Sequence, residues 1–407
     1  MASINDENPG IMVEMKSVPE NRITDNPEEM QLHVRMVLVN GPEQSVQAPR
    51  AAALFGSDTK IHFKTKGRLG SIWPSWQSIN CVSKGFVYCI DLGFPQAAMA
   101  ALGRRLKRKT QLVFEIGDPM RPLLKGQDKN KLELYIATLF DKVLPYQADA
   151  LVFRGTYLRD YFRKLNPSRQ LPPSLWLPDG VDTDLFRPLQ ESADINHLKT
   201  KYKLQSKLVV GLVGSIHHSP MHNLFYGWEM VETIARLPES SDIIGVIVGD
   251  GPGRPVLEQA IKKYRLENRI HLIGRVPHAE VPLWMNVFDV ALSTQTDDPV
   301  GWGRTTAKLP EYLACGTPVL CSDVGEAHRL LSGSGQTISY KGMRDESYPE
   351  KLAAEILKLT PETLGIWRQS NRRLAQEFFA YPLIQLKLRG FLNDLADRRL
   401  NHGDWVF

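Results

Sequence analysis

The sequence predicts an α/β protein of two doubly wound domains, each built on a parallel sheet with helices on both faces. The chain has 407 residues, which is more than one ordinary hydrophobic core accommodates. Short apolar runs of strand length alternate with helical stretches, and this alternation occurs in two successive series. If the two domains face each other, the carboxyl ends of both sheets border one crevice, where ligands of open α/β sheets bind.

The strands of both series are predicted from apolar runs that end at turn residues. In the first series these runs are HVRMVLVN, TKIHF, GFVYCIDLG, TQLVFEIGD, ADALVF and PSLWLPDG. In the second they are KLVVGLVGS, DIIGVIVGDG, NRIHLIGRV, FDVALST and TPVLCSD. Helices are expected between them, in segments such as PQAAMAALGRRLKRK, KLELYIATLFDKVLPY and TTAKLPEYLAC. A parallel sheet follows because each strand is joined to the next through a helix.

The chain divides into five predicted segments. The first thirty residues contain seven acidic and two basic residues and three prolines, so we expect a loosely ordered acidic arm there. The stretch GVDTDLFRPLQESADIN between the two series is acidic and has no clear period, which indicates an interdomain connection. The predicted boundaries are 1–30 for the arm, 31–180 for an N-terminal Rossmann-like domain, 181–195 for the connection, 196–375 for a C-terminal Rossmann-like domain and 376–407 for C-terminal helices that pack back on the first domain.

Composition excludes several classes of protein. The chain has 50 basic and 45 acidic residues, a net charge of +5, and this surplus is too small to predict nucleic-acid binding. Cys81, Cys89, Cys315 and Cys321 lie in or beside apolar runs without a CxxC spacing, so we expect buried, reduced thiols in a cytoplasmic protein. The apolar stretches are all shorter than a bilayer span.

The segment from 297 to 326, DDPVGWGRTTAKLPEYLACGTPVLCSDVGE, carries the clearest chemical signal. It follows a predicted buried strand, and Gly301 and Gly303 allow a tight turn before a helix whose free N–H groups attract anions. Arg304, Lys308 and Glu311 are spaced by four and three, so they share one face if the helix begins early enough. Two cations and a carboxylate beside a helix start suit a nucleotide diphosphate and its ribose hydroxyls. The alternative is a solvated Arg–Lys–Glu stripe on an amphipathic helix.

Several motifs together resemble the GT-B glycosyltransferases, in particular glycosyltransferase family 4. The run EYLACGTPVLCSDVG is similar to the family's sequence around its second glutamate, here Glu311. The other matching stretches are LPDGVDTDLFRP at 177–188, IVGDGPGR at 247–254, HLIGRVPHAEVPLWMNVFDVALSTQ at 271–295 and FEIGDP at 114–119. Each stretch alone is weak, but the set occurs in the order of the family.

The resemblance implies a retaining glycosyltransferase that moves a sugar from a UDP- or GDP-sugar to a glycan, lipid-linked or small-molecule acceptor, with no metal or other cofactor required. The first domain would then bind the acceptor and the second the nucleotide sugar. Glu311 would bind the donor ribose. The implied catalytic residues are Asp118, Arg304, Lys308 and Glu311, and the implied donor-binding residues are Gly214, Ser215, Asp250, Gly251, Arg275, Val276, Gly303, Thr305 and Thr306.

The sequence also departs from the family pattern at donor-binding positions. The family's earlier glutamate, eight residues before the second, is replaced by Gly303, and the loop GSIHHSPMHN has Ser215 where the family has arginine. The lysine of that loop falls near Met221 or His222. Arg304 and Lys308 would restore two positive charges. The departures leave two alternatives open: a catalytically weak GT-B scaffold or glycan-binding protein, and a nucleotide-sugar epimerase with the same fold.

Two further groups of polar residues each have two interpretations. Asp118 follows a predicted strand, where it could orient an acceptor hydroxyl or cap the turn before Pro119, whereas Glu115 lies within the strand and is expected to be structural. His217, His218 and His222 invite a metal hypothesis. Because no clustered cysteine or carboxylate completes a four-ligand site, we predict a phosphate-facing or solvated loop and no metal.

A basic cluster, RRLKRK, follows the apolar run FPQAAMAAL. Its cations are Arg104, Arg105, Lys107, Arg108 and Lys109. Such a segment either rests on an anionic membrane, which would place the protein peripherally at the inner membrane surface, or forms the solvated end of a helix. The second interpretation is the preferred one.

Overall fold

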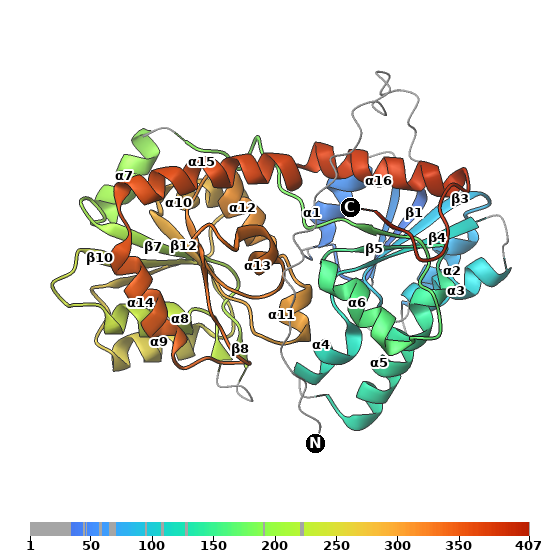
Figure 1. Ribbon diagram of the computed structural model, residues 1–407, viewed down its shortest axis with the longest axis horizontal. Coiled ribbons are helices and arrows are strands. Elements are labelled where there is room, and N and C mark those ends of the chain that lie inside the picture. Colours follow the sequence, from blue (N-terminus) through green and yellow to red (C-terminus); the bar gives the residue numbers. More distant parts are fainter. Residues whose placement is uncertain are drawn as a thin grey trace.

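The computed structural model describes residues 34–406, except 44, 46, 57–58, 65–70, 94–95, 107–109, 127–128, 190–191 and 220–223. The predicted acidic arm lies outside the described residues. Two α/β domains stand side by side, and two long helices run across both of them (Figure 1).

The first domain has a seven-stranded parallel sheet in the order β15-β6-β5-β4-β3-β1-β2. Its strands are β1 (Val34–Val39), β2 (Lys60–Phe63), β3 (Gly85–Ile90), β4 (Thr110–Ile116), β5 (Ala150–Phe153), β6 (Ser174–Trp176) and β15 (Trp405–Val406). The direction of winding reverses between β1 and β3, which is the switch point where ligands of such sheets bind.

Helices cover both faces of this sheet. They are α1 (Gln47–Phe55), α2 (Ile72–Asn80), α3 (Gln96–Leu106), α4 (Met120–Gly126), α5 (Lys131–Val143) and α6 (Thr156–Leu165), with a 3₁₀ turn at Leu144–Gln147. Ile79 of α2, Ala97 of α3 and Phe162 of α6 belong to one core cluster, whereas Leu54 of α1 belongs to the core on the opposite face. The two clusters follow from strands that are apolar on both sides.

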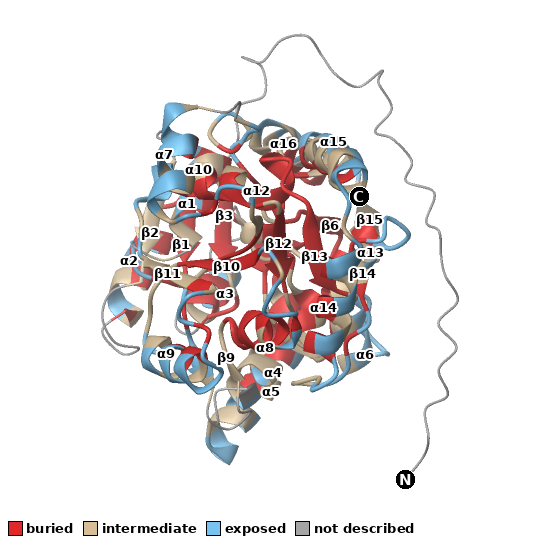
Figure 2. Ribbon diagram, turned by 90° about the vertical axis from the view of Figure 1, so that its left-hand side faces the viewer, coloured by how far each residue is buried: buried red, intermediate tan, exposed pale blue. Residues whose placement is uncertain are grey.

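The second domain has a six-stranded parallel sheet in the order β11-β10-β7-β12-β13-β14, the strand order of a Rossmann fold. Its strands are β7 (Leu208–Val213), β10 (Ile243–Val248), β11 (Ile270–Gly274), β12 (Val290–Ser293), β13 (Val319–Ser322) and β14 (Thr337–Ile338). A small antiparallel ribbon, β8 (His218–Ser219) and β9 (Leu224–Phe225), lies in the loop after β7. All six residues of β10 are buried, and Figure 2 shows the sheets as the buried centre of the molecule.

The helices of the second domain include several that the sequence patterns did not predict. The helices of this domain are α7 (Ala193–Lys201), α8 (Trp228–Arg236), α9 (Arg254–Lys263), α10 (Val281–Val287), α11 (Pro299–Gly303), α12 (Lys308–Ala314), α13 (Gly325–Leu331) and α14 (Tyr348–Lys358). Helix α11 lies where the sequence predicts only a tight turn at Gly301 and Gly303, and it begins at an N-cap in which the Asp298 carboxylate accepts a hydrogen bond from the Gly301 N–H.

The last two helices connect the domains. Helix α15 (Pro361–Phe378) packs against α12 in the second domain, and α16 (Tyr381–Ala396) packs against α1 in the first (Figure 1). Between them the chain pairs with the connection, because Val181 N–H donates to the Phe379 carbonyl at 2.8 Å and Tyr381 N–H donates to the Val181 carbonyl at 3.1 Å. Within the described residues, no helix has both the length and the apolar character needed to cross a bilayer.

Candidate functional site

The two domains meet at α11. A Cβ atom on Gly155, at the start of α6, would lie 2.2 Å from the Gly303 carbonyl oxygen, and one on Gly303 would lie 2.7 Å from Leu158 Cδ2. Tyr157 and Trp302 pack edge to face beside this contact, with ring centroids 4.9 Å apart. Gly303 occupies the position of the glutamate in the family pattern, and a side chain there would require the buried Leu158 to shift.

An ion pair joins the domains next to this contact. Asp118, after β4, accepts hydrogen bonds from Arg304 Nε at 2.7 Å and from Arg304 Nη2 at 2.9 Å. Burial alone would lower the pKa of Arg304, but its hydrogen bonds and charge interaction with Asp118 raise it. Arg304 has an extended backbone, and α12 begins only at Lys308. Arg304 therefore does not lie on one helix face with Lys308 and Glu311. That arrangement is expected only for a helix that begins earlier.

A second interdomain contact involves a buried carboxylate that sequence reasoning missed. One oxygen of Glu326 on α13 accepts hydrogen bonds from the Thr156 N–H and the Thr156 hydroxyl, both at 2.6 Å. Its other oxygen accepts from Arg329 Nε at 2.9 Å. Glu326 therefore caps α6 from across the interface, a contact that depends on tertiary structure and leaves no local signal in the sequence.

The glycine turns after β7 and β10 lie against each other. A Cβ atom on Gly249 would be 1.8 Å from the Gly214 carbonyl oxygen. Ile216 N–H donates to the Asp250 carbonyl at 3.1 Å, and the Asp250 carboxylate accepts from the Gly251 N–H at 2.8 Å. The structure thus brings together four of the predicted donor residues, Gly214, Ser215, Asp250 and Gly251, at the carboxyl edge of the second sheet.

Lys308, at the start of α12, contacts Tyr226, and the Tyr226 hydroxyl lies beside the Gly214 turn. Its Nζ donates to the Tyr226 hydroxyl at 2.6 Å and lies 4.5 Å from the centre of that ring. The Tyr226 oxygen would be 2.5 Å from a Cβ atom on Gly214. Burial lowers the pKa of Lys308 to about 8, although the charge of Glu229 opposes the shift. The lysine is therefore a half-buried cation near neutral pH whose hydrogen-bond partner is a neutral phenol.

Glu311, one helical turn further on, faces the loop after β11. Its Oε1 lies 3.7 Å from His278 Nε2, and burial raises the pKa of Glu311 while the interaction with His278 opposes the rise. The same interaction raises the pKa of His278. The predicted base-flanking residues precede this histidine: Arg275 is exposed, and Val276 packs against the core.

Two threonines occupy the bend between α11 and α12. Thr305 is buried, and its hydroxyl donates to the Arg154 carbonyl of the first domain at 3.4 Å. Thr306 adopts a positive φ of 56°, which is uncommon for a residue with a Cβ and marks a held backbone conformation. Among the described residues, the buried Thr306 hydroxyl has no hydrogen-bond partner.

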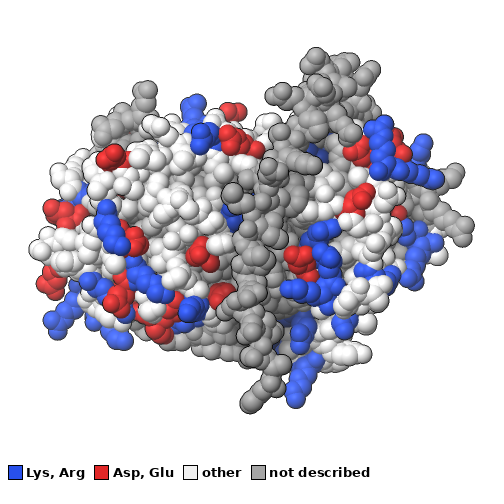
Figure 3. All heavy atoms as spheres, viewed as in Figure 1, with Lys and Arg blue, Asp and Glu red and all other residues white. Residues whose placement is uncertain are grey.

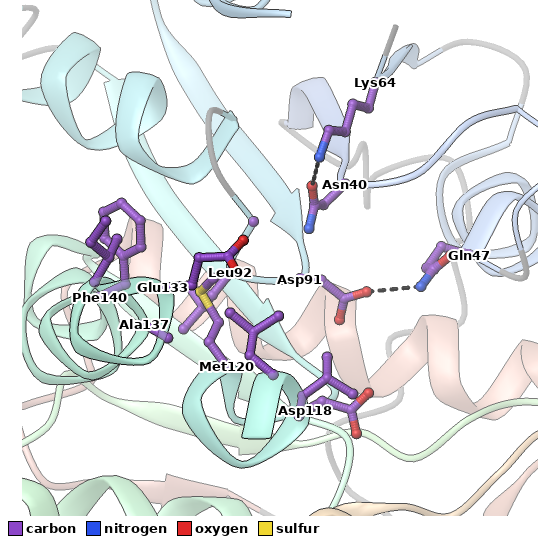
Figure 4. Close-up of a pocket in the computed structure, with 14 residues that line it drawn as sticks. Asn40, Gln47, Lys64, Asp91, Leu92, Asp118, Met120, Glu133, Ala137 and Phe140 are labelled. Carbon is purple, nitrogen blue, oxygen red and sulfur yellow. Dashed lines mark hydrogen bonds between the residues drawn. The ribbon is translucent and has the colours of Figure 1, made fainter. Parts of the chain in front are cut away.

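A cavity of about 620 Å³ lies at the carboxyl edge of the first sheet. Asn40 and Asp91, which follow β1 and β3, place it at the switch point, and Asp118 lines its side nearest the second domain. Figure 4 shows Asn40, Gln47, Lys64 and Asp91 on one side of the cavity and residues of α4 and α5 on the other. The wall from α4 and α5 is mainly apolar; it contains Met120, Leu123, Leu124, Ile136, Ala137 and Phe140.

A buried network of ion pairs lies at the carboxyl edge of the first sheet, beside the cavity. Glu115 is fully buried; one oxygen accepts from Arg50 Nε at 2.8 Å and the other accepts from the Tyr88 hydroxyl at 2.7 Å. Arg154 contacts Glu115 at 3.4 Å, Asp179 at 3.6 Å and also Asp91. Glu115 is therefore structural, as predicted. The network also gives Asp179, which stands where the family has asparagine, a cationic partner.

The described arginines of the basic cluster have partners within the first domain. Arg104 forms an ion pair with Asp149, and Arg105 donates to the Gln147 side chain at 2.6 Å. Lys107, Arg108, Lys109 and His222 lie outside the described residues. Within the described part of the chain, no three His, Cys, Asp or Glu residues are grouped so that they could hold a metal ion.

Comparison with known proteins explains the second domain. Residues 207–361 match the family model described as Glycosyl transferases group 1. The second domain is therefore similar to the glycosyltransferases of that family. The match begins with β7 and ends at the start of α15, so it contains both glycine turns, Lys308 and Glu311.

Curated relatives match about half of the chain, and a solved structure matches most of it. A 2-deoxystreptamine glucosyltransferase of Streptomyces kanamyceticus is 32% identical over 55% of this chain and 55% of its own length. A lipopolysaccharide core biosynthesis mannosyltransferase of Rhizobium meliloti is 28% identical over 40% of this chain and 44% of its own length. The chain thus spans about half the length of the curated relatives that it matches.

The structure of HepE of Anabaena, in complex with UDP and glucose, aligns with a TM-score of 0.69 at 16% identity. It covers 89% of this chain and 100% of the HepE chain. This likeness shows the fold, and it confirms the predicted GT-B architecture of two Rossmann-like domains.

Proposed function

We propose that the protein is a retaining glycosyltransferase that transfers a sugar from a UDP- or GDP-sugar to an acceptor bound by the first domain. The observation that carries this proposal is that two glycine turns and Lys308 meet at the carboxyl edge of the second domain, with Glu311 one helical turn further along α12. Backbone N–H groups of such turns and a nearby cation suit a diphosphate, and a carboxylate suits the two hydroxyls of a ribose.

Each donor-binding residue has a defined task in this proposal. Lys308 neutralises the diphosphate next to the Gly214 turn, and Glu311 accepts hydrogen bonds from the ribose beside the loop that contains Arg275 and Val276. The phenol of Tyr226 places the ammonium group at this turn without neutralising it. An ion pair separated by about 4 Å is worth roughly 1 kcal/mol in water but about 4 kcal/mol at an effective dielectric constant near 20, so the half-buried position of Lys308 strengthens the attraction.

The acceptor occupies the cavity of the first domain. Asp118 lines that cavity and accepts two hydrogen bonds from Arg304, so one carboxylate contacts both the acceptor side and the donor side of the interface. In this position it orients an acceptor hydroxyl toward the sugar carbon. Catalysis then comes from positioning and from neutralising the departing diphosphate, with Arg304 and Lys308 as the two cations. No protein nucleophile is assigned.

A donor screen by thermal unfolding tests the proposal. A nucleotide sugar at about one hundred times its dissociation constant should stabilise the protein by about 2.7 kcal/mol. We expect Glu311→Ala and Lys308→Gln to lose this stabilisation, while the exposed control Lys358→Ala keeps it. Unchanged stabilisation in both site variants would contradict the assigned site.

Turnover separates the transferase from its alternatives and tests the metal requirement. We expect nucleotide release that depends on an acceptor extract and persists in the presence of EDTA. Donor binding without any release would favour a scaffold, and an epimerised nucleotide sugar formed without acceptor would favour an epimerase. Loss of activity on chelation, restored by a divalent cation, would contradict the proposed metal independence.

A further inference from the structure

Helix α5 presents an apolar stripe to solvent. Its buried residues are only Ala137 and Asp141. The exposed stripe consists of Leu132, Tyr135, Ile136, Leu139 and Val143, with exposed fractions of 67%, 69%, 42%, 51% and 38%. Their spacing of three, one, three and four places them on one face of the helix. An apolar face of this size directed outward marks an interaction surface.

The inner face of α5, opposite the stripe, is held against its neighbours by hydrogen bonds of Asp141. The Asp141 carboxylate accepts hydrogen bonds from the backbone N–H groups of Met120 and Arg121 at 3.0 and 2.9 Å, and from the Tyr161 hydroxyl at 3.3 Å. These bonds anchor α5 to the first turn of α4 and to α6. The stripe therefore remains outside the domain core because the opposite side of the helix is fixed against its neighbours.

Cations flank the stripe. Lys131 and Lys142 are exposed on α5, and Arg121 and Lys125 are exposed on the adjoining α4. In Figure 3, Lys and Arg side chains gather along the lower edge of the first domain, where Figure 1 places these two helices. Apolar side chains bordered by lysine and arginine are the pattern of a helix that lies in the interface of an anionic bilayer.

We propose that the α5 stripe, with its flanking cations, docks the protein on an anionic lipid bilayer. Ile136 belongs both to the stripe and to the wall of the first-domain cavity, so docking brings the mouth of the cavity to the lipid surface. If the proposed transferase activity holds, the acceptor is an amphiphile presented at that surface. The docking itself does not depend on that activity and can be tested without it.

Vesicle co-sedimentation tests the docking surface. The probes are vesicles of phosphatidylcholine alone and of phosphatidylcholine mixed with phosphatidylglycerol. The full chain should sediment with the anionic vesicles, and the triple variant Leu132→Ser, Tyr135→Ser and Leu139→Ser should bind them roughly tenfold or more weakly. The matched control is Leu357→Ser with Ile366→Ser, because these side chains of the second domain are 56% and 61% exposed; it should bind like the wild type.

A charge variant and a folding check complete the test. Lys131→Glu with Lys142→Glu should weaken binding to anionic vesicles, and added salt should do the same. The triple variant should unfold at the wild-type urea concentration and keep the donor-dependent stabilisation, since none of its three residues lines the cavity. Failure of docking is thereby distinguished from failure of the proposed function, which would abolish the donor response and leave vesicle binding unchanged.

Three outcomes would overturn the docking proposal. The first is a wild type that ignores anionic vesicles or a triple variant that binds them as well as the wild type does. The second is a wild-type dimer that the triple variant dissociates without any change in vesicle binding, which would assign the stripe to a second copy of the chain. The third is vesicle binding that appears only after removal of residues 1–33, which would assign the stripe to the acidic N-terminal segment.

Discussion

The carboxyl edges of the two sheets carry charge in opposite ways. In the first domain, Arg50 and Arg154 are matched by the carboxylates of Glu115, Asp91 and Asp179. In the second domain, Lys308 donates to the neutral hydroxyl of Tyr226, and burial lowers its pKa to about 8. The cations of the first edge therefore form ion pairs within the domain, whereas the second edge presents a cation whose charge a ligand can neutralise.

This difference separates stability from binding. Removing one member of a buried ion network lowers the free energy of unfolding, because its partner remains as an uncompensated buried charge. A partly desolvated lysine beside glycine turns costs folding free energy while it is charged, and it stabilises an anion that enters the site. Variants at the two edges should therefore affect different measurements, and the variants that follow test this separation.

The largest effect is expected at the first edge. Arg50→Met leaves the fully buried Glu115 without its closest cation, so the free energy of unfolding should fall by about 3 kcal/mol. The change is measured by urea unfolding, and the affinity of the folded variant for the donor should stay within about twofold of wild type. The exposed pair of Lys358 and Glu355 provides the control: Lys358→Met should change stability by less than about 0.5 kcal/mol.

A smaller effect, on binding rather than on stability, is expected at the second edge. Lys308→Gln should weaken nucleotide affinity by roughly tenfold or more, since the diphosphate loses its half-buried cation. Calorimetric titration measures the affinity, and urea unfolding provides the comparison. A loss of stability without a loss of affinity would contradict the distinction between the two edges.

The pH dependence of the second edge follows from the same lysine. The protonated form binds the diphosphate, so affinity should be constant below pH 7 and should fall by up to about tenfold per pH unit above the pKa of about 8. Protein stability has the opposite sign: between about 8 and the ordinary lysine value of 10.5, the unfolded chain binds more protons, so the free energy of unfolding rises with pH. Both dependences should disappear in Lys308→Gln.

The smallest effect is expected where the two edges meet. Asp118→Asn and Arg304→Gln each remove the bidentate pair, and a double-mutant cycle on kcat/KM should give a coupling energy on the order of 1 kcal/mol. Additive effects of the two substitutions would show that the pair does not link acceptor and donor. The exposed pair of Arg163 and Asp160 on α6 provides a control cycle in which the substitutions should be additive.

Most strands of the two sheets were predictable because they are apolar runs that end at turn residues, whereas the two-residue edge strands β14 and β15 were not predicted. Strand β10 with its turn was predicted from DIIGVIVGDG, and strand β7 from KLVVGLVGS. In both runs the strand propensity of the residues agrees with their burial in the sheet. Helix α11 was missed because PVGWG is short and contains two glycines, which propensity alone assigns to a turn. The helix begins where the Asp298 side chain accepts a hydrogen bond from the Gly301 N–H, and propensity does not register this single contact.

The sequence indicated part of the candidate site for the same reason. Gly214, Asp250, Gly251, Lys308 and Glu311 lie in or directly after local motifs, so the sequence indicated both their type and their position. Other contacts are tertiary: Glu326 on Thr156 spans 170 residues of chain, and the network of Arg50 joins residues that share no local pattern. The pairing of Arg304 with Asp118 rather than with a helix face also depends on how closely the domains approach at Gly303.

A crystal structure with bound UDP or GDP tests the central claim most directly. We predict a diphosphate between the Gly214 turn and the Lys308 ammonium group, with the ribose hydroxyls on the Glu311 carboxylate. A nucleotide bound elsewhere, or an edge that stays closed by Tyr226 and Lys308 at saturating nucleotide, would contradict the account.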